Sequence, residues 1–98
     1  MATVSTESVI YRRGKVQGDR LTRALVDAAS AGLRPNCSDP PSRHIWLSEH
    51  EGERREAARL CAGCAVFGPC GTAAEARQER FGVWAGVDRT KAPGKKAA

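Results

Sequence analysis

The chain has 98 residues and a formal net charge of +5, a size that allows one small domain with a single hydrophobic core. Leu, Ile, Val and Phe together number only 16, a share below the roughly 20% at which chains become too poor in apolar residues to pack without help. The N-terminal residues carry charges throughout and contain no continuous apolar stretch, which excludes a secretory signal and a membrane span and predicts a cytoplasmic protein. We expect disulfides, a metal or a partner to supply the missing stability.

Residues 1–18 are expected to form a flexible N-terminal segment, followed by a first helix from Asp19 to Ala31. Asp19 is placed to cap the start of this helix and Gly32 to end it. Apolar residues recur within it at intervals of three and four, which predicts one buried stripe. The stripe consists of Leu21, Ala24, Leu25, Ala28 and Ala29.

Three prolines, an Asn and an Asp in the stretch LRPNCSDPPSRHIWL predict an extended, turning loop that holds Cys37. Ser48 and Glu51 have the S-x-x-E spacing of a capping box, and the helix formers after them predict a second helix that delivers Cys61. Cys64 follows by about one helical turn, which keeps the two sulfurs on one side.

The Gly-Pro pair before Cys70 is expected to break the chain, and Thr72 with Glu75 offers a cap for a third helix running to about Arg80. Cys70 would then lie just ahead of this helix. There the positive end of the helix dipole would lower the pKa of its thiol and favour metal ligation.

The segment FGVWAG, residues 81–86, is typical of a turn, here one that presents Val83 and Trp84. A basic tail follows at residues 88–98. No internal repeat and no alternating strand pattern appears, so the predicted fold class is all-α. We expect a small domain of three to four helices at residues 19–87.

The chain contains four cysteines, Cys37, Cys61, Cys64 and Cys70, in the spacing C-x23-C-x2-C-x5-C. In a reducing cytosol such a set is more often a metal site than a disulfide framework. Four thiolates can bind zinc tetrahedrally or hold a cubane iron–sulfur cluster. Zinc ribbons typically use two C-x2-C pairs and this chain has one, so the spacing favours iron and sulfur but leaves zinc open.

The cysteine order, ending in C-x2-C-x5-C and followed by GVWAG and a basic tail, resembles the WhiB-like family of actinobacterial and phage transcription regulators. The resemblance covers residues 37–96. It implies one 4Fe-4S cluster that is ligated by all four cysteines, organises the helices and responds to redox gases or nitric oxide. It also implies that the protein docks on the C-terminal domain of the principal sigma factor of RNA polymerase.

By the same resemblance, the tryptophan turn is expected to contact the sigma factor, chiefly through Trp84. The other residues expected in or beside that contact are Gly82, Val83, Gly86 and Trp46. Core packing is the alternative interpretation for both tryptophans, and for Trp46 a further one is shielding of the cluster.

Promoter DNA is the second expected partner, because the tail carries four basic residues: Arg89, Lys91, Lys95 and Lys96. Without a long basic helix or an arginine hook, the tail has little means of reading bases and should contribute sequence-independent phosphate contacts. Three basic residues lie near the N-terminus: Arg12, Arg13 and Lys15. They could touch nucleic acid, but the simpler interpretation is that they contact nothing.

Two features depart from the family pattern. The loop between Cys37 and Cys61, with 23 residues, is at the long end of what the family shows. In the turn, Ala85 stands where the family commonly has glycine. A Cβ there is tolerated if residue 85 has a negative φ.

No catalytic constellation is present, so an enzyme is not expected. The alternatives that remain are a cluster-free thiol–disulfide reductase, built on the Cys61-Ala-Gly-Cys64 pair, and a structural zinc module that binds protein.

His44 and His50 could serve as ligands. Because four cysteines already complete a site, both are expected at the surface. The run EGERRE is interpreted as a solvated helix face.

Overall fold

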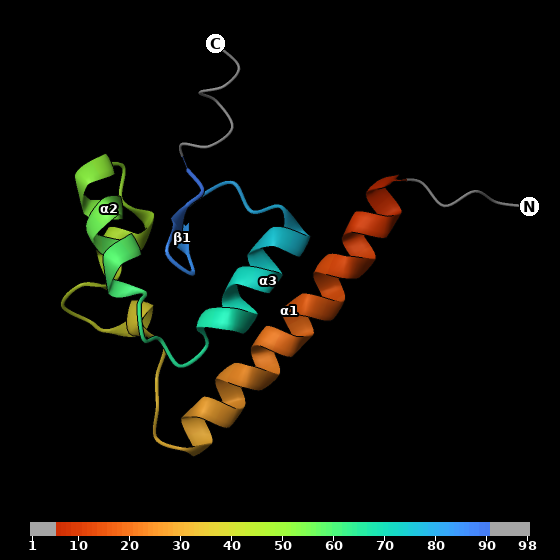
Figure 1. Ribbon diagram of the computed structural model, residues 1–98, viewed down its shortest axis with the longest axis horizontal. Helices are drawn as coiled ribbons and strands as arrows, with labels where there is room; N and C mark the ends of the chain where they lie inside the picture. The colour runs from red at the N-terminus through yellow and green to blue at the C-terminus, as the bar shows by residue number, and fades with distance from the viewer. Residues whose placement is uncertain (1–5, 91–98) are drawn as a thin grey trace, which may run out of the picture.

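The computed structural model describes residues 6–90 of the chain (Figure 1). Its elements in chain order are helix α1 (Thr6–Ser30), the 3-10 turns η1 (Asn36–Ser38) and η2 (Arg43–Leu47), helices α2 (Glu51–Leu60) and α3 (Phe67–Arg77), and strands β1 (Val83–Trp84) and β2 (Val87–Asp88). Helices dominate this part of the chain, as predicted. The two strands correct the prediction of a purely α fold.

Helix α1 begins at Thr6, so the predicted start at Asp19 was wrong. Gly14 and Gly18 lower the intrinsic helix propensity of this stretch, which is why the sequence pattern favoured a flexible segment. Both glycines face α3: a Cβ added at Gly14 would lie 3.0 Å from Cγ of Arg77, and one at Gly18 would lie 3.8 Å from its Nη1. The close approach of the Arg77 side chain therefore favours glycine at position 14 over better helix formers, whereas the distance at Gly18 is an ordinary contact.

The C-terminal half of α1 follows the prediction more closely. Gly32 ends the helix with a φ of +79°, and the N–H groups of Gly32 and Leu33 donate to the carbonyls of Ala29 and Ala28. Four members of the predicted stripe are half-buried, namely Leu21, Ala24, Leu25 and Ala28, whereas Ala29 is exposed. Figure 1 shows α3 lying alongside α1, and these two helices form one layer of the fold.

Helix α2 leads into Cys61 as predicted, but its start differs. The predicted capping box does not form: His50 is the N-cap residue and its side chain makes no capping hydrogen bond. Oγ of Ser48 accepts a hydrogen bond from the N–H of His50 at 2.9 Å and also bonds to the carboxylate of Glu53. Ser48 thus still organises this helix start, from outside it.

Helix α3 begins at Phe67, so the Gly-Pro pair does not break the chain. Pro69 occupies the first turn, where the N–H that it lacks would have no helical partner. Cys70 consequently lies inside the helix rather than ahead of it, and its N–H donates to the carbonyl of Val66 at 2.9 Å. The hydroxyl of Thr72 donates back to the carbonyl of Gly68 at 3.1 Å and caps nothing.

Helix α3 ends at Arg77, earlier than the predicted Arg80. The next residue, Gln78, takes the left-handed conformation with a φ of 55°. Its N–H donates to the carbonyl of Glu75, and that of Glu79 donates to the carbonyl of Ala74. The left-handed position in this helix-ending pattern is usually glycine. Because it is glutamine here, the sequence carried no signal for the end of the helix.

The strands pair antiparallel, with Val83 opposite Asp88 and Trp84 opposite Val87. The loop between them, Ala85 and Gly86, has positive φ at both positions, 49° and 81°. Such a two-residue loop matches the twist of a hairpin. Ala85 therefore does not have the negative φ that would let residue 85 carry a Cβ without strain.

A buried hydrophobic cluster joins η2, α2 and β1. It consists of Ile45, Trp46, Ala57, Cys61 and Val83. Among the residues that the structure describes, no large side chain is less than 2% exposed. A hydrophobic core this small agrees with the low content of large apolar residues in the sequence. It also agrees with the expected need for an additional stabilising group.

A buried ion pair connects α2 to the hairpin. Nε of Arg54 lies 3.0 Å from both carboxylate oxygens of Asp88, and Nη1 donates to the carbonyl of Ser48 at 2.9 Å. The side chains of Arg54 and Asp88 are only 8% and 14% exposed. The interpretation of EGERRE as a fully solvated face was therefore wrong for Arg54.

Candidate functional site

The four cysteines line a single small cavity of about 40 Å³. Cys37 comes from η1, Cys61 from the end of α2, Cys64 from the loop after it, and Cys70 from α3. All four are free thiols. The rest of the lining is largely apolar and includes Pro35, Trp46, Val66, Phe67, Val83 and Ala85. The fold thus brings cysteines from segments far apart in the chain together at one cavity.

N–H groups of the backbone and of an indole ring point at these sulfurs. Nε1 of Trp46 donates to Sγ of Cys61 at 3.4 Å, and the backbone N–H of Asn36 donates to Sγ of Cys64 at 3.5 Å. The backbone of Ala85, in the hairpin loop, hydrogen-bonds to the thiol of Cys70. Hydrogen bonds of this kind stabilise negative charge on sulfur.

Sequence reasoning did not identify Asn36. Its side-chain amide donates to the carbonyl of Leu60 at 2.8 Å and to that of Ala62 at 3.3 Å, so it ties η1 to the end of α2. Its place directly before Cys37, in a Pro-Asn-Cys loop, was the one available signal. Asn36 thereby holds the cavity closed between two of its cysteine-bearing segments.

Burial raises the pKa of the thiol of Cys37, and repulsion from Cys64 raises it further. Burial also raises the pKa of Cys70, against the lowering effect of the hydrogen bond from Ala85. The expectation that the helix dipole would lower the pKa of Cys70 is therefore corrected. In the metal-free protein, desolvation has the larger effect on this thiol.

The cysteines are not arranged around a point. Within residues 6–90, no group of three or more His, Cys, Asp or Glu side chains is placed to hold a single metal ion. His44 and His50 are exposed, and neither lines the cysteine cavity. The prediction that both lie at the surface is confirmed.

The tryptophan turn divides into a buried and an accessible part. Val83 is 6% exposed and Trp46 5% exposed, and Gly82 is buried as well. These three have little exposed surface in this structure, and their expected place in or beside the partner contact stays a prediction. Trp84 is half-buried and its Nε1 donates to the carbonyl of Phe81 at 2.8 Å.

Exposed apolar side chains surround the hairpin, a feature that the sequence pattern did not reveal. Leu47, Phe67, Phe81 and Val87 are all exposed. A Cβ at Gly82 would lie 2.7 Å from Cδ2 of Leu47, and one at Gly86 would lie 3.7 Å from a ring carbon of Phe67. Gly82 therefore lets the side chain of Leu47 approach the turn, whereas the distance at Gly86 is an ordinary contact.

The predicted basic tail begins inside the fold. Arg89 is 18% exposed, and its Nη2 donates to Glu75 of α3 at 3.2 Å. Its N–H donates to the carbonyl of Gly82 at 2.9 Å. Arg89 therefore has a partner within the protein. The remaining predicted DNA contacts, Lys91, Lys95 and Lys96, lie outside the described residues.

Replacing Ala85 with glycine is expected to raise the free energy of unfolding by about 0.5 to 1 kcal/mol. The left-handed conformation costs an L-residue about 1 to 2 kcal/mol, which the replacement removes. Part of this gain is lost because glycine also makes the unfolded chain more flexible. Gly86→Ala, in the same loop, is the matched control and should destabilise. Urea denaturation measures both. A destabilising Ala85→Gly would show that the Cβ contributes more to packing than it costs in strain.

None of the helices among residues 6–90 has the length and hydrophobicity of a membrane span.

Residues 27–92 match the family model described as transcription factor WhiB. The chain is 40% identical over 81 residues to the transcriptional regulator WhiB of Streptomyces coelicolor, an alignment that covers 76% of this chain and 90% of the relative.

Two further relatives come from Mycolicibacterium smegmatis. The chain is 48% identical over 42 residues to transcriptional regulator WhiB7 and 49% identical over 42 residues to transcriptional regulator WhiB2. Each alignment covers 43% of this chain, and the chain spans only 41% and 33% of the respective relatives. No solved structure gives a significant match.

Proposed function

Because this chain belongs to the WhiB family of transcription factors, we propose that it regulates transcription as a cluster-binding protein in the cytoplasm. In this proposal Cys37, Cys61, Cys64 and Cys70 hold one 4Fe-4S cluster. The cluster domain acts through the C-terminal domain of the principal sigma factor of RNA polymerase, near promoter DNA. The cavity shared by the four thiols is the observation that carries the proposal.

The spacing of the cysteines in the sequence favours a cluster over zinc. Zinc ribbons typically use two C-x2-C pairs, whereas this chain has one, Cys61 and Cys64. All four thiols line one cavity, and four thiolates are the ligand set of a cubane cluster.

Loading requires the cavity to widen. A volume of about 40 Å³ holds about three water-sized spheres, less than the four irons and four sulfides of a cubane occupy. Cys37 is the one cysteine on the exposed side, on the short turn η1. We therefore expect the loop that carries Cys37 to move most when the cluster is inserted.

Such a cluster supplies a group that accepts electrons and reacts with oxygen or nitric oxide. The protein's own contribution is the set of N–H donors on sulfur: the indole of Trp46 and the backbones of Asn36 and Ala85. These donors stabilise the charge of the thiolates and tune the redox potential of what they bind. Because ligation and folding share one free energy, damage to the cluster would loosen three segments at once.

The surface proposed for the sigma factor is the hairpin and its apolar surroundings. Trp84 is half-buried, while Leu47 and Phe81 are exposed beside the turn. Large apolar side chains gathered on one surface are typical of protein interfaces. Gly86 contributes through its positive φ of 81°, which the turn requires.

Trp84→Ala is expected to weaken binding to the sigma-factor domain by roughly thirtyfold or more, since a central aromatic anchor contributes at least about 2 kcal/mol. Calorimetry on anaerobic protein measures the affinity, and the visible spectrum reports the cluster. Tyr11→Ala, which removes an aromatic residue that is 71% exposed on α1, is the control and should leave the affinity unchanged. If Trp84→Ala loses the cluster instead, Trp84 is a core residue.

A thiol–disulfide reductase is the second candidate, favoured only by the C-x-x-C pair. The reactive thiol of such an enzyme must be accessible, whereas Cys61 is 6% exposed and bonded to Trp46. The strands that the structure describes form one antiparallel hairpin and not the parallel βαβ unit of thioredoxins. We therefore favour the cluster-binding regulator.

A further inference from the structure

Helix α1 carries an arginine strip, which we define as Arg12, Arg13 and Arg20. All three side chains are exposed. Within the part of the chain whose side chains the structure describes, none of them forms an ion pair, whereas Lys15 is paired with Asp19 at 3.2 Å. Arg13 and Arg20 stand seven residues apart, close to two helical turns and about 10 Å along the axis, so they project from the same side of α1.

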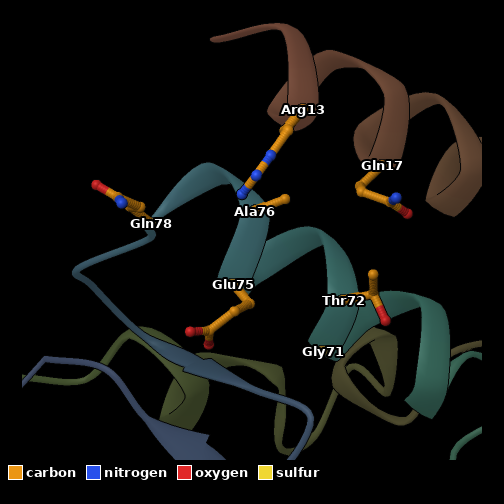
Figure 2. A pocket seen from close by; sticks show the side chains of 7 residues that line it. All are labelled: Arg13, Gln17, Gly71, Thr72, Glu75, Ala76 and Gln78. Atoms are coloured by element: carbon orange, nitrogen blue, oxygen red, sulfur yellow. The ribbon is translucent and has the colours of Figure 1, made fainter. Parts of the chain in front are cut away.

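A polar groove borders this strip, between α1 and α3. Its volume is about 600 Å³, and its lining includes Arg13 and Gln17 from α1 with Thr72 and Gln78 from the region of α3. Figure 2 shows Arg13 reaching from α1 toward Ala76 of α3, and Gln17 projecting from α1 in the same region as Thr72. Arg13, Gln17 and Gln78 can each donate a hydrogen bond to a ligand, whereas the one hydroxyl proton of Thr72 is already donated to the carbonyl of Gly68.

The groove contains one opposing charge, the carboxylate of Glu75. It accepts a hydrogen bond from Arg89 at 3.2 Å, which offsets its charge. In Figure 2 the side chain of Glu75 points away from α1. The half of the groove nearest the arginine strip therefore presents donors and positive charge to a ligand.

The groove and the cysteine cavity lie on different faces of α3. Phe67 and Cys70 line the cavity, whereas Thr72, Glu75 and Ala76 line the groove. At 100° per residue, the two sets project in roughly opposite directions from the helix axis.

We propose that the arginine strip and the groove beside it bind the phosphate backbone of promoter DNA. The proposal rests on the function proposed above, since it says where a regulator docked on a sigma factor touches nearby DNA. Arg and Gln side chains are among the usual donors to phosphate oxygens, and such contacts position a protein without reading sequence. Arg12, Arg13 and Arg20 each neutralise one phosphate.

The test replaces all three arginines with glutamine, which keeps the length and helix propensity of the side chains. The charge-matched control is Arg34→Gln/Arg43→Gln/Arg55→Gln, three arginines that are exposed outside α1. Fluorescence anisotropy of a labelled 20-base-pair duplex of arbitrary sequence, titrated with the full-length protein at several salt concentrations, gives the affinity and its salt slope.

The log–log salt slope of the strip variant should be shallower by about 2.7, at about 0.9 per lost phosphate contact. Its affinity near 0.1 M salt should fall at least about tenfold, while the control keeps the parent slope. Arg12→Gln/Arg20→Gln spares Arg13, which lies against α3, and should shift the slope by about 1.8 if the triple variant fails to fold.

Equal losses in the strip variant and the control would overturn the proposal, because only overall charge would then matter. An unchanged duplex affinity with weaker sigma-factor binding would also overturn it and would make the strip a protein-docking surface. Binding to the sigma-factor domain is measured on the same preparations. If the protein binds DNA through the arginine strip but does not bind the sigma-factor domain, the proposed function is wrong and this inference is still supported.

Discussion

Arg54→Ala is expected to lower the free energy of unfolding by about 3 to 5 kcal/mol, because it leaves the buried carboxylate of Asp88 without its partner. The guanidinium also donates to the carbonyl of Ser48, so the substitution removes a link between α2, the hairpin and the loop before α2. For a domain of this size the midpoint of thermal unfolding should fall by at least about 12 °C. Circular dichroism of anaerobic protein measures the shift.

The control is Arg55→Ala, one position along the same helix. Arg55 lies 3.9 Å from Glu51, with side chains 74% and 52% exposed, and exposed pairs of this kind contribute about 0 to 1 kcal/mol. The double variant Arg54→Met/Asp88→Leu should recover much of the loss, since apolar replacement of both partners removes the unpaired charge. Equal, small shifts for Arg54→Ala and Arg55→Ala would show that the buried pair has no special role.

Single replacement of any of the four cysteines that we propose as cluster ligands is expected to have the second large effect. Cys37→Ser, Cys61→Ser, Cys64→Ser and Cys70→Ser should each lose the visible absorption of the cluster and most of the helical signal. The cause is that binding free energy at such a site is folding free energy, and the core is too thin to replace it. Absorption and circular dichroism of anaerobic protein measure both losses.

His44→Ala is the matched control for these variants. His44 is exposed and does not line the cavity, so its loss should leave iron content and helicity unchanged. A cysteine variant that kept full iron content would remove that residue from the ligand set. A cysteine variant that lost iron but kept its helical signal would contradict the proposed link between ligation and folding.

The features predicted correctly from sequence depend on local signals. Gly32 ends α1 because a left-handed residue closes the helix, and the helix formers before Cys61 form α2. The prediction that a helix delivers Cys61 is confirmed, whereas Cys37, expected on an extended loop, lies in the 3-10 turn η1, and Cys70 lies inside α3 rather than ahead of it. That all four cysteines line one cavity could not be worked out from spacing, because it depends on how η1, α2 and α3 pack.

The errors arose where tertiary contacts override local preference. Gly14 and Gly18 weaken a helix in isolation but accommodate Arg77 of α3, so α1 begins earlier than predicted. Pro69 is tolerated because it falls in the first turn of α3. The burial of Arg54 has no local signal, since its partner Asp88 lies far along the chain.

The hairpin was missed for a different reason. Each strand has only two residues, too few for alternation to show, and the loop reads Ala-Gly rather than the Asn-Gly or Asp-Gly that usually marks such a turn. Ala85 is left with positive φ and a backbone hydrogen bond to Cys70. The turn is thus both a predicted partner surface and a wall of the cysteine cavity.

The central claim is that the shared cavity of Cys37, Cys61, Cys64 and Cys70 holds a cubane cluster. Iron, acid-labile sulfide and zinc measured per chain in protein purified without oxygen test this claim most directly. The account predicts about four irons and about four sulfides per chain and no stoichiometric zinc. One zinc per chain with no sulfide would contradict it and would make the cavity a structural zinc site.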